Sequence, residues 1–217
     1  ATILLLLFAA GNAMVLQGLT KMPEFIGVMH AFASIYVPLV WLPSLVALVG
    51  VALYSQTHFP ALANRIWAGL GAGGVATFVL DTFRQLGVIH GWLPMDTVQL
   101  FGKMIMGPQS PELAWLGVGL VYHFLNGASF GVFFTLVFGK VHWGWAVVWG
   151  LIVELGMMTL PPMAPLVGPF GSKTGGPALF LITLIAHLGY GAALGLLAQA
   201  WVKHKGGIFA LMKGKIS

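Results

Sequence analysis

The chain has 217 residues, of which 59% are hydrophobic and only 7% are charged. An average soluble domain is about 25% charged, so this composition excludes an ordinary soluble protein and indicates a membrane protein. The formal net charge is +5, but the basic residues lie at the ends of apolar segments, where they typically face anionic lipid and not nucleic acid. The absence of cysteine excludes disulfides, thiolate metal sites and a cysteine nucleophile.

Six apolar segments are long enough to cross a hydrocarbon core of about 30 Å as helices. They predict an all-α fold, a polytopic transmembrane helical bundle of about six helices. The first segment is expected to be a retained helix, since it lacks a basic leader and another long apolar run follows it at once. Runs of this length disfavour an outer-membrane barrel, whose strands alternate over about ten residues. The predicted spans are residues 2–19, 26–54, 66–89, 114–139, 143–162 and 177–202.

Two features modify this simple picture. Pro38 and Pro43 lie inside the overlong second span, and each removes a backbone donor, so we expect a kink or a strong tilt there. Residues 91–112 and 161–177 are expected to be long loops on the same side of the membrane. Such loops either carry function or serve as plain linkers.

The basic residues predict an orientation. An even number of spans places both termini on one side, here named side A, with the two long loops on the opposite side B. Side A would hold Arg65, Lys140 and four lysines of the tail but no acidic residue, so the positive-inside bias makes side A the cytoplasm. The predicted organisation is an N-terminal pair of helices (1–60), a four-helix domain (64–202) and a basic cytoplasmic tail (203–217) that rests on the lipid surface.

Two predicted spans share the pattern H-x3-G-x3-G. Steps of four residues place the histidine and both glycines on one helix face, each a turn apart. We expect these glycine faces to point inward, because close helix packing requires small residues at the contact. The preceding span contains a deep acid in both cases, which is consistent with a tandem two-helix repeat in the last four spans. The members are Asp81 with His123, Gly127 and Gly131, and Glu154 with His187, Gly191 and Gly195.

The acids and histidines of this repeat are predicted to share one depth, roughly 12 to 15 Å from side B at a rise of about 1.5 Å per residue. Ionisable groups inside a bilayer are costly unless paired, and they often mark function. One interpretation is a structural network in which each histidine bonds to an acid without any cofactor, and this is the default. The other interpretation is a cofactor site.

The sharpest form of the cofactor hypothesis is a b-type haem with two axial histidines, glycines that leave room for the porphyrin, and an arginine that pairs with the propionates. A metal ion held by two histidines and two acids is the alternative. The haem residues would be His123, His187, Arg84, Gly127 and Gly191; the metal ligands would be His123, His187, Asp81 and Glu154, with His30 close by.

Four segments carry a resemblance to a known family: AGLGAGGVATFVLD, YHFLNGASFG, MMTLPPMAP and AHLGYGAALG. Over residues 64–201 the chain resembles the uncharacterised bacterial inner-membrane proteins of the YagU-like kind, which are four-helix domains of unknown function. The resemblance implies an architecture and a location, the bacterial inner membrane, but no activity. The first two helices lie outside it.

No Walker motif, H-E-x-x-H or Ser/His/Asp arrangement is present, and an enzyme is disfavoured. The leading hypothesis is an integral membrane subunit or accessory protein of a larger complex, whose polar cluster is structural or holds a cofactor. The alternatives are a small proton- or ion-coupled transporter or channel, and a b-haem, metal or quinone-linked redox protein. The expected partners are the lipid bilayer and other membrane subunits or a second copy of the chain, with no nucleic acid.

Overall fold

The computed structural model describes residues 22–93, 96–160, 164 and 167–214, and this part is helical without any strand. The all-α prediction is therefore confirmed. The first predicted span, residues 2–19, lies outside the described residues. In chain order the elements are α2 (Met22–Tyr36), the π-helix η2 (Val37–Trp41), α3 (Leu42–His58), α4 (Pro60–Ile89), α5 (Thr97–Met106), α6 (Glu112–Phe138), α7 (Gly144–Thr159), the short 3-10 helix η3 (Pro169–Gly171), α9 (Gly176–Trp201) and α10 (Ile208–Met212).

Four helical segments are long and apolar enough to cross a membrane, and they coincide with predicted spans to within a few residues. They are Ile26–His58 with 33 residues, Pro60–Ile89 with 30, Glu112–Phe138 with 27 and Gly176–Trp201 with 26. The predicted span 143–162 is shorter than expected, because α7 ends at Thr159 after 16 residues. At about 1.5 Å per residue, α7 is roughly 24 Å long.

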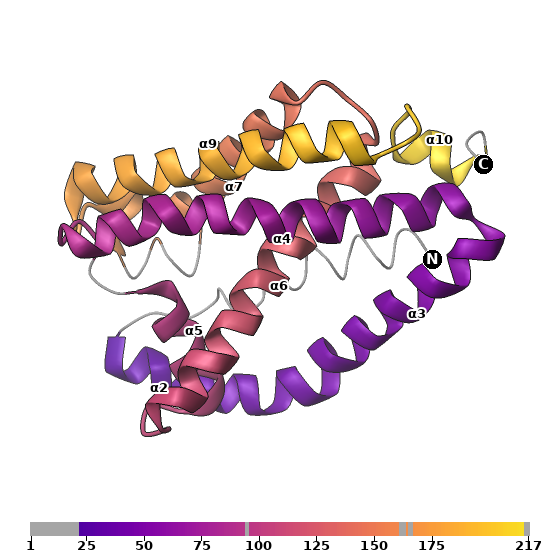
Figure 1. Ribbon diagram of the computed structural model, residues 1–217. Coiled ribbons are helices and arrows are strands. Elements are labelled where there is room, and N and C mark those ends of the chain that lie inside the picture. Colours follow the sequence, from indigo (N-terminus) through magenta and orange to yellow (C-terminus); the bar gives the residue numbers. More distant parts are fainter. Residues whose placement is uncertain (1–21, 94–95, 161–163, 165–166, 215–217) are drawn as a thin grey trace.

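The helices α2 and α3 form one long arm that bends at η2, as Figure 1 shows. Pro38 lies inside the π-helical turn, and Pro43 lies in the first turn of α3. A proline in a helix interior removes a backbone hydrogen bond, and a π turn is one of the ways in which a helix absorbs that loss. The kink predicted from these two prolines is confirmed.

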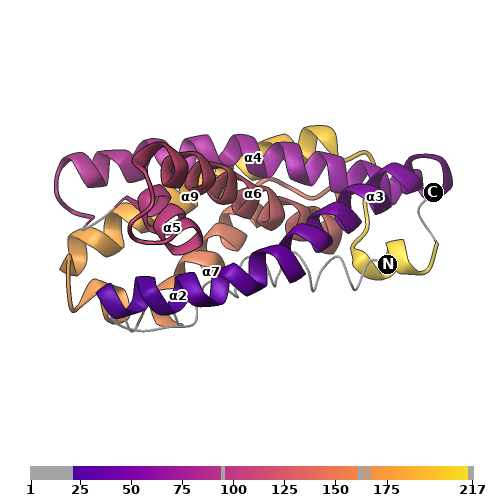
Figure 2. The same ribbon diagram turned by 90° about the horizontal axis from the view of Figure 1, so that it is seen from below.

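The helix α4 is the centre of the bundle. It packs against α6 on one side and α9 on the other, while α7 packs on α9 and α5 packs on α6. Figures 1 and 2 show α4 and α9 side by side along most of their length, with α6 crossing α4 obliquely. The arm joins the bundle through α2 on α5 and through α3 on the beginning of α4.

Glycine stripes set how closely these helices approach. A Cβ added at Gly73 would overlap the backbone of α6 at Gly127 and Ala128, and one added at Gly191 would overlap the backbone of α7 at Ala146. Small residues at such contacts let two helix backbones come together without intervening side chains. The predicted inward orientation of the glycine faces is confirmed.

The long loop expected at residues 91–112 contains the helix α5 (Thr97–Met106), which was not predicted from the sequence. Asp96 caps this helix by accepting a hydrogen bond from the backbone of Val98. Its apolar face includes Leu100 and Met104, which are buried against α2 and Tyr122 of α6. A ten-residue amphipathic helix is too short to be predicted as a transmembrane span. It can be predicted instead from its N-cap residue and the helical periodicity of its apolar residues.

Arg65, which we expected among the basic residues of side A, is fully buried near the beginning of α4. Its Nη1 donates to the carbonyl of Leu136 at 3.2 Å and its Nη2 to the carbonyl of Gly206 at 2.6 Å. Arg65 thus satisfies a carbonyl in the last turn of α6, where the helix dipole is negative. The same guanidinium also holds the C-terminal segment against the bundle.

Candidate functional site

The acids and histidines singled out in the sequence form two pairs, each between neighbouring helices. Nε2 of His123 on α6 lies 2.9 Å from Oδ1 of Asp81 on α4. Nδ1 of His187 on α9 lies 2.8 Å from Oε2 of Glu154 on α7. Each acid therefore contacts the histidine of the packing partner that follows it in the sequence, as expected for a repeated two-helix unit.

The first pair belongs to a larger ionic network that extends toward side B. Arg84, one turn beyond Asp81, donates from Nε to Asp81 Oδ1 and from Nη1 to Asp96 Oδ1, both at 2.9 Å. Gln85 donates from Nε2 to Asp96 Oδ2 at 2.7 Å. The network thus joins α4 and α6 to the beginning of α5.

The sequence interpretation placed Arg84 near a haem and treated Asp96 as a loop charge, and it did not consider Gln85. The sequence did contain a sign of the helix α5. Asp96 directly precedes an amphipathic apolar segment, and Asp is one of the preferred N-cap residues of helices. Recognising α5 would have placed a carboxylate at a helix start near the side B end of α4, where Arg84 lies.

The guanidinium of Arg84 lies between two carboxylates and its side chain is only 6% exposed, against 28% for Asp96. Burial alone would raise the pKa of Asp96, but hydrogen bonds from Gln85 and Arg84 and the positive charge of Arg84 together hold this pKa below its ordinary value. Asp96 therefore remains ionised as the partner of Arg84 at neutral pH.

The second pair is enclosed within the bundle. Glu154 is fully buried, and its Oε1 accepts a hydrogen bond of 2.7 Å from the hydroxyl of Thr183. His187 Nδ1 lies 2.8 Å from Glu154 Oε2 and 2.9 Å from the backbone oxygen of Thr183. One ring nitrogen carries at most one proton. The hydrogen bond of this nitrogen goes to the backbone oxygen of Thr183, whereas Glu154 Oε2 is a close polar contact without a hydrogen-bond partner among the described residues.

The structure does not bring the proposed cofactor residues into one site. The two pairs lie in different helix pairs, and the described residues contain no group of three or more His, Cys, Asp or Glu side chains that could hold a metal ion. The space beside Gly127 is filled by the side chain of Thr77, and the space beside Gly191 by the backbone of α7. Both glycines lie at helix contacts, and Arg84 forms ion pairs with two carboxylates.

His30 lies apart from both pairs. Its Nδ1 donates to the backbone oxygen of Ile105 at 3.1 Å, and its ring borders Gly107 just after α5. The residue ties α2 to the C-terminal end of α5, so its role in this structure is to hold the arm against the bundle.

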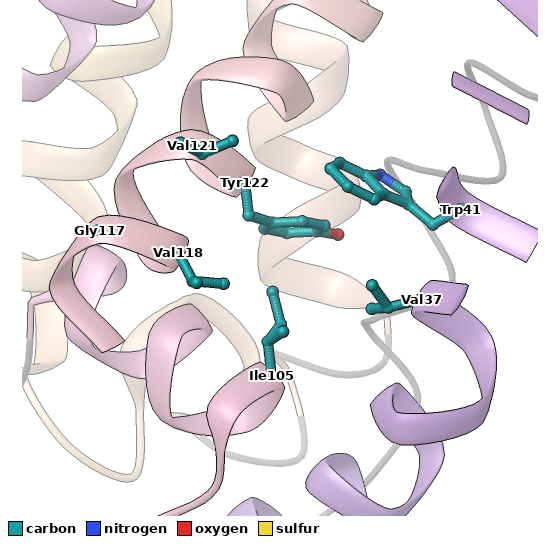
Figure 3. A pocket seen from close by; sticks show the side chains of 7 residues that line it. All are labelled: Val37, Trp41, Ile105, Gly117, Val118, Val121 and Tyr122. Carbon is teal, nitrogen blue, oxygen red and sulfur yellow. The ribbon is translucent and has the colours of Figure 1, made fainter. Parts of the chain in front are cut away.

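An apolar pocket of about 260 Å³ lies between η2, α5 and α6. Figure 3 shows the rings of Trp41 and Tyr122 next to one another at the pocket, with their centroids 5.7 Å apart. Phe101 of α5 connects the pocket to the first pair, since its ring centroid lies 5.1 Å from that of Tyr122 and 6.0 Å from that of His123. Sites for whole small molecules usually exceed about 300 Å³ and include several polar groups, so this pocket is small for such a ligand. It is lined by Val37, Trp41, Ile105, Gly117, Val118, Val121 and Tyr122.

Comparison with family models, with curated proteins and with solved structures gave no match to the chain. The resemblance to the YagU-like proteins therefore stays a prediction.

Proposed function

We propose that the chain is a polytopic integral membrane protein of the bacterial inner membrane and acts as a non-catalytic subunit or accessory protein of a larger complex. In this proposal the two acid–histidine pairs are bonds between helices. Each carboxylate is matched by an imidazole of the facing helix, which is how buried polar groups support helix association in a bilayer.

The proposed surface for a partner is the arm formed by α2, η2 and α3. Only 22% of the most apolar window of Ile26–His58 is buried, against 50% for Glu112–Phe138. Leu39 and Val46 are 71% and 70% exposed. A long apolar helix with so little cover from the described residues is suited to packing against another membrane helix, and this single observation carries the proposal.

The proposed orientation of the chain in the membrane rests on one end of the bundle, where the beginning of α4, the end of α9 and the segment before α7 meet. Asn64 near the beginning of α4 donates to the carbonyl of Trp201 at the end of α9, and Gln199 accepts from the backbone of Trp143 just before α7. The described basic residues of side A cluster at this end. We assign it to the cytoplasm by the positive-inside bias, with both termini on that side.

Photo-crosslinking in native membranes tests the subunit proposal. The chain has no cysteine, so Leu39→Cys carries a unique benzophenone label on the arm. Ile152→Cys on α7, which is also exposed, is the matched control. We expect a discrete protein adduct from position 39 and lipid adducts from position 152. Lipid adducts alone at both positions would contradict the proposed partner surface.

A second candidate function, a proton-coupled carrier or channel, is favoured by one specific observation. Oε2 of the fully buried Glu154 lies 2.8 Å from Nδ1 of His187 but has no hydrogen-bond partner among the described residues, and a buried acid beside an imidazole suits proton exchange. In liposomes that enclose a pH-sensitive dye, an acid pulse should then acidify the interior faster with the wild-type chain than with folded Glu154→Gln. Equal rates for the two proteins and for empty liposomes would eliminate this candidate.

A further inference from the structure

The side A end of the bundle holds an excess of positive charge. In the described part of the chain the ion pairs involve only Asp81, Arg84, Asp96, Glu154 and two histidines. None of the side A cations has an acidic partner there. These described cations are Arg65, Lys140, Lys203, Lys205 and Lys213.

The segment that carries three of these lysines is fixed to the bundle by several hydrogen bonds. The backbone nitrogen of Lys203 donates to Asn64 Oδ1 at 2.8 Å, and that of Lys140 donates to the carbonyl of His204 at 3.1 Å. The buried Arg65 donates to the carbonyl of Gly206. Residues 203–206 therefore follow the ends of α4, α6 and α9.

This attachment orients the short helix α10. Leu211 packs against the buried cluster of α3, α4 and α6 that includes Leu136. On its other side Phe209 is 75% exposed and Met212 is 50% exposed, and Lys213 is exposed beside them. The segment thus presents apolar and cationic side chains together on the outside of the bundle.

Exposed tryptophans surround the same end. Trp67 lies in the second turn of α4, Trp143 and Trp145 lie at the beginning of α7, and Trp201 ends α9. Amphipathic indole rings concentrate at the level of lipid headgroups. The exposed side chains of α10 and the lysines lie at the end of the bundle where such a belt would meet the headgroups.

We propose that residues 203–213 form a pre-positioned surface that binds the anionic phospholipids of the leaflet at side A. Phe209 and Met212 enter the apolar edge of the leaflet, and Lys203, Lys205 and Lys213 face the lipid phosphates. Cationic residues near an anionic membrane surface are attracted to it, and exposed aromatic and aliphatic side chains add the apolar part of the binding. The hydrogen bond from Arg65 keeps the surface in place.

The test uses the whole chain in lipid nanodiscs. A single Met212→Cys variant carries an NBD label, and the discs contain doxyl-labelled lipid with either phosphatidylglycerol or phosphatidylcholine as the main component. We expect strong quenching and a blue-shifted emission in the anionic discs, and a clear loss of both in the neutral discs. A Gln109→Cys label at the opposite end should respond equally in the two kinds of disc.

A charge variant separates electrostatic binding from simple proximity. Replacing Lys203, Lys205 and Lys213 by Gln should lower quenching in anionic discs to the level of neutral discs, whereas Lys173→Gln on side B should leave it unchanged. All three replaced lysines are exposed, and a monodisperse elution profile checks that the variant is folded. Equal quenching in both lipids, a water-exposed label in both, or no effect of the triple replacement would each overturn the proposal.

Discussion

The two helix pairs α4/α6 and α7/α9 use the same contact but have different surroundings. Both pack through a glycine stripe, and both place an acid against a histidine. Three residues after the acid, the first pair has Arg84 and the second has Met157. Four residues before the histidine, the first has Gly119 and the second has Thr183.

The residues at these two positions, three after the acid and four before the histidine, explain why the surroundings of the two pairs differ. Arg84 draws Asp96 and the beginning of α5 into an ionic network, and Gly119 permits close approach of the α5 backbone at Val98. In the second pair, Thr183 supplies a hydroxyl that donates to Oε1 of Glu154 within the bundle. A repeated pattern therefore specifies helix contact, while the residues beside it decide whether the site is ionic or enclosed.

The largest expected effect is loss of the fold when a stripe glycine is enlarged. Gly73→Leu and Gly191→Leu should prevent folding, because the new side chain would overlap a facing backbone that has no room to move. Gly74 and Gly156 have open space beside them, so Gly74→Leu and Gly156→Leu are matched controls. Expression and monodispersity in detergent measure the outcome. Equal behaviour of Gly73→Leu and Gly74→Leu would refute the packing account.

Replacing Arg84 by Met makes the first pair resemble the second. Two carboxylates then lose their buried cation, so unfolding free energy should fall by about 3 kcal/mol or more. Adding Asp81→Asn should restore part of that loss, since it removes one of the uncompensated charges. Titration with a denaturing detergent measures both. A double variant no more stable than Arg84→Met alone would argue against a charge-based network.

Thr183→Val tests the enclosed pair. It leaves Glu154 Oε1 buried without its hydroxyl donor, which should cost about 1–3 kcal/mol of stability. The control is Thr82→Val, because that hydroxyl is exposed and bonds only to its own helix at Phe78; its effect should stay within about 0.5 kcal/mol. Similar small losses in both variants would remove the proposed role of Thr183.

The smallest effect is a dependence on pH. Because the pKa of Asp96 is lowered in the folded state, its contribution to stability is present above the unfolded pKa of about 3.9 and is lost as pH falls through the folded value. Asp96→Asn should therefore be less stable than the wild type at neutral pH, and the gap should narrow below about pH 4. Thermal unfolding measured from pH 3 to 7 checks this. A gap that stays constant with pH would contradict the ionic role.

Sequence patterns predicted the elements that depend on local periodicity and failed where distant segments meet. The described spans and the inward glycine faces followed from apolar length and a four-residue spacing. The default pairing of Asp81 with His123 followed from depth alone. The burial of Arg65 did not, because its partners Leu136 and Gly206 are distant in sequence and use backbone oxygens, which no residue pattern marks. The role of Asp96 was missed because it depends on the helix α5.

The central claim is that the acids and histidines form two independent interhelical bonds, and double-mutant cycles test it most directly. Combining Asp81→Asn with His123→Ala, and Glu154→Gln with His187→Ala, should give interaction free energies of about 0.5–3 kcal/mol within each pair. The crossed cycle of Asp81→Asn with His187→Ala should be additive within about 0.5 kcal/mol. Strong coupling in the crossed cycle would contradict the account and would indicate that all four residues share one site.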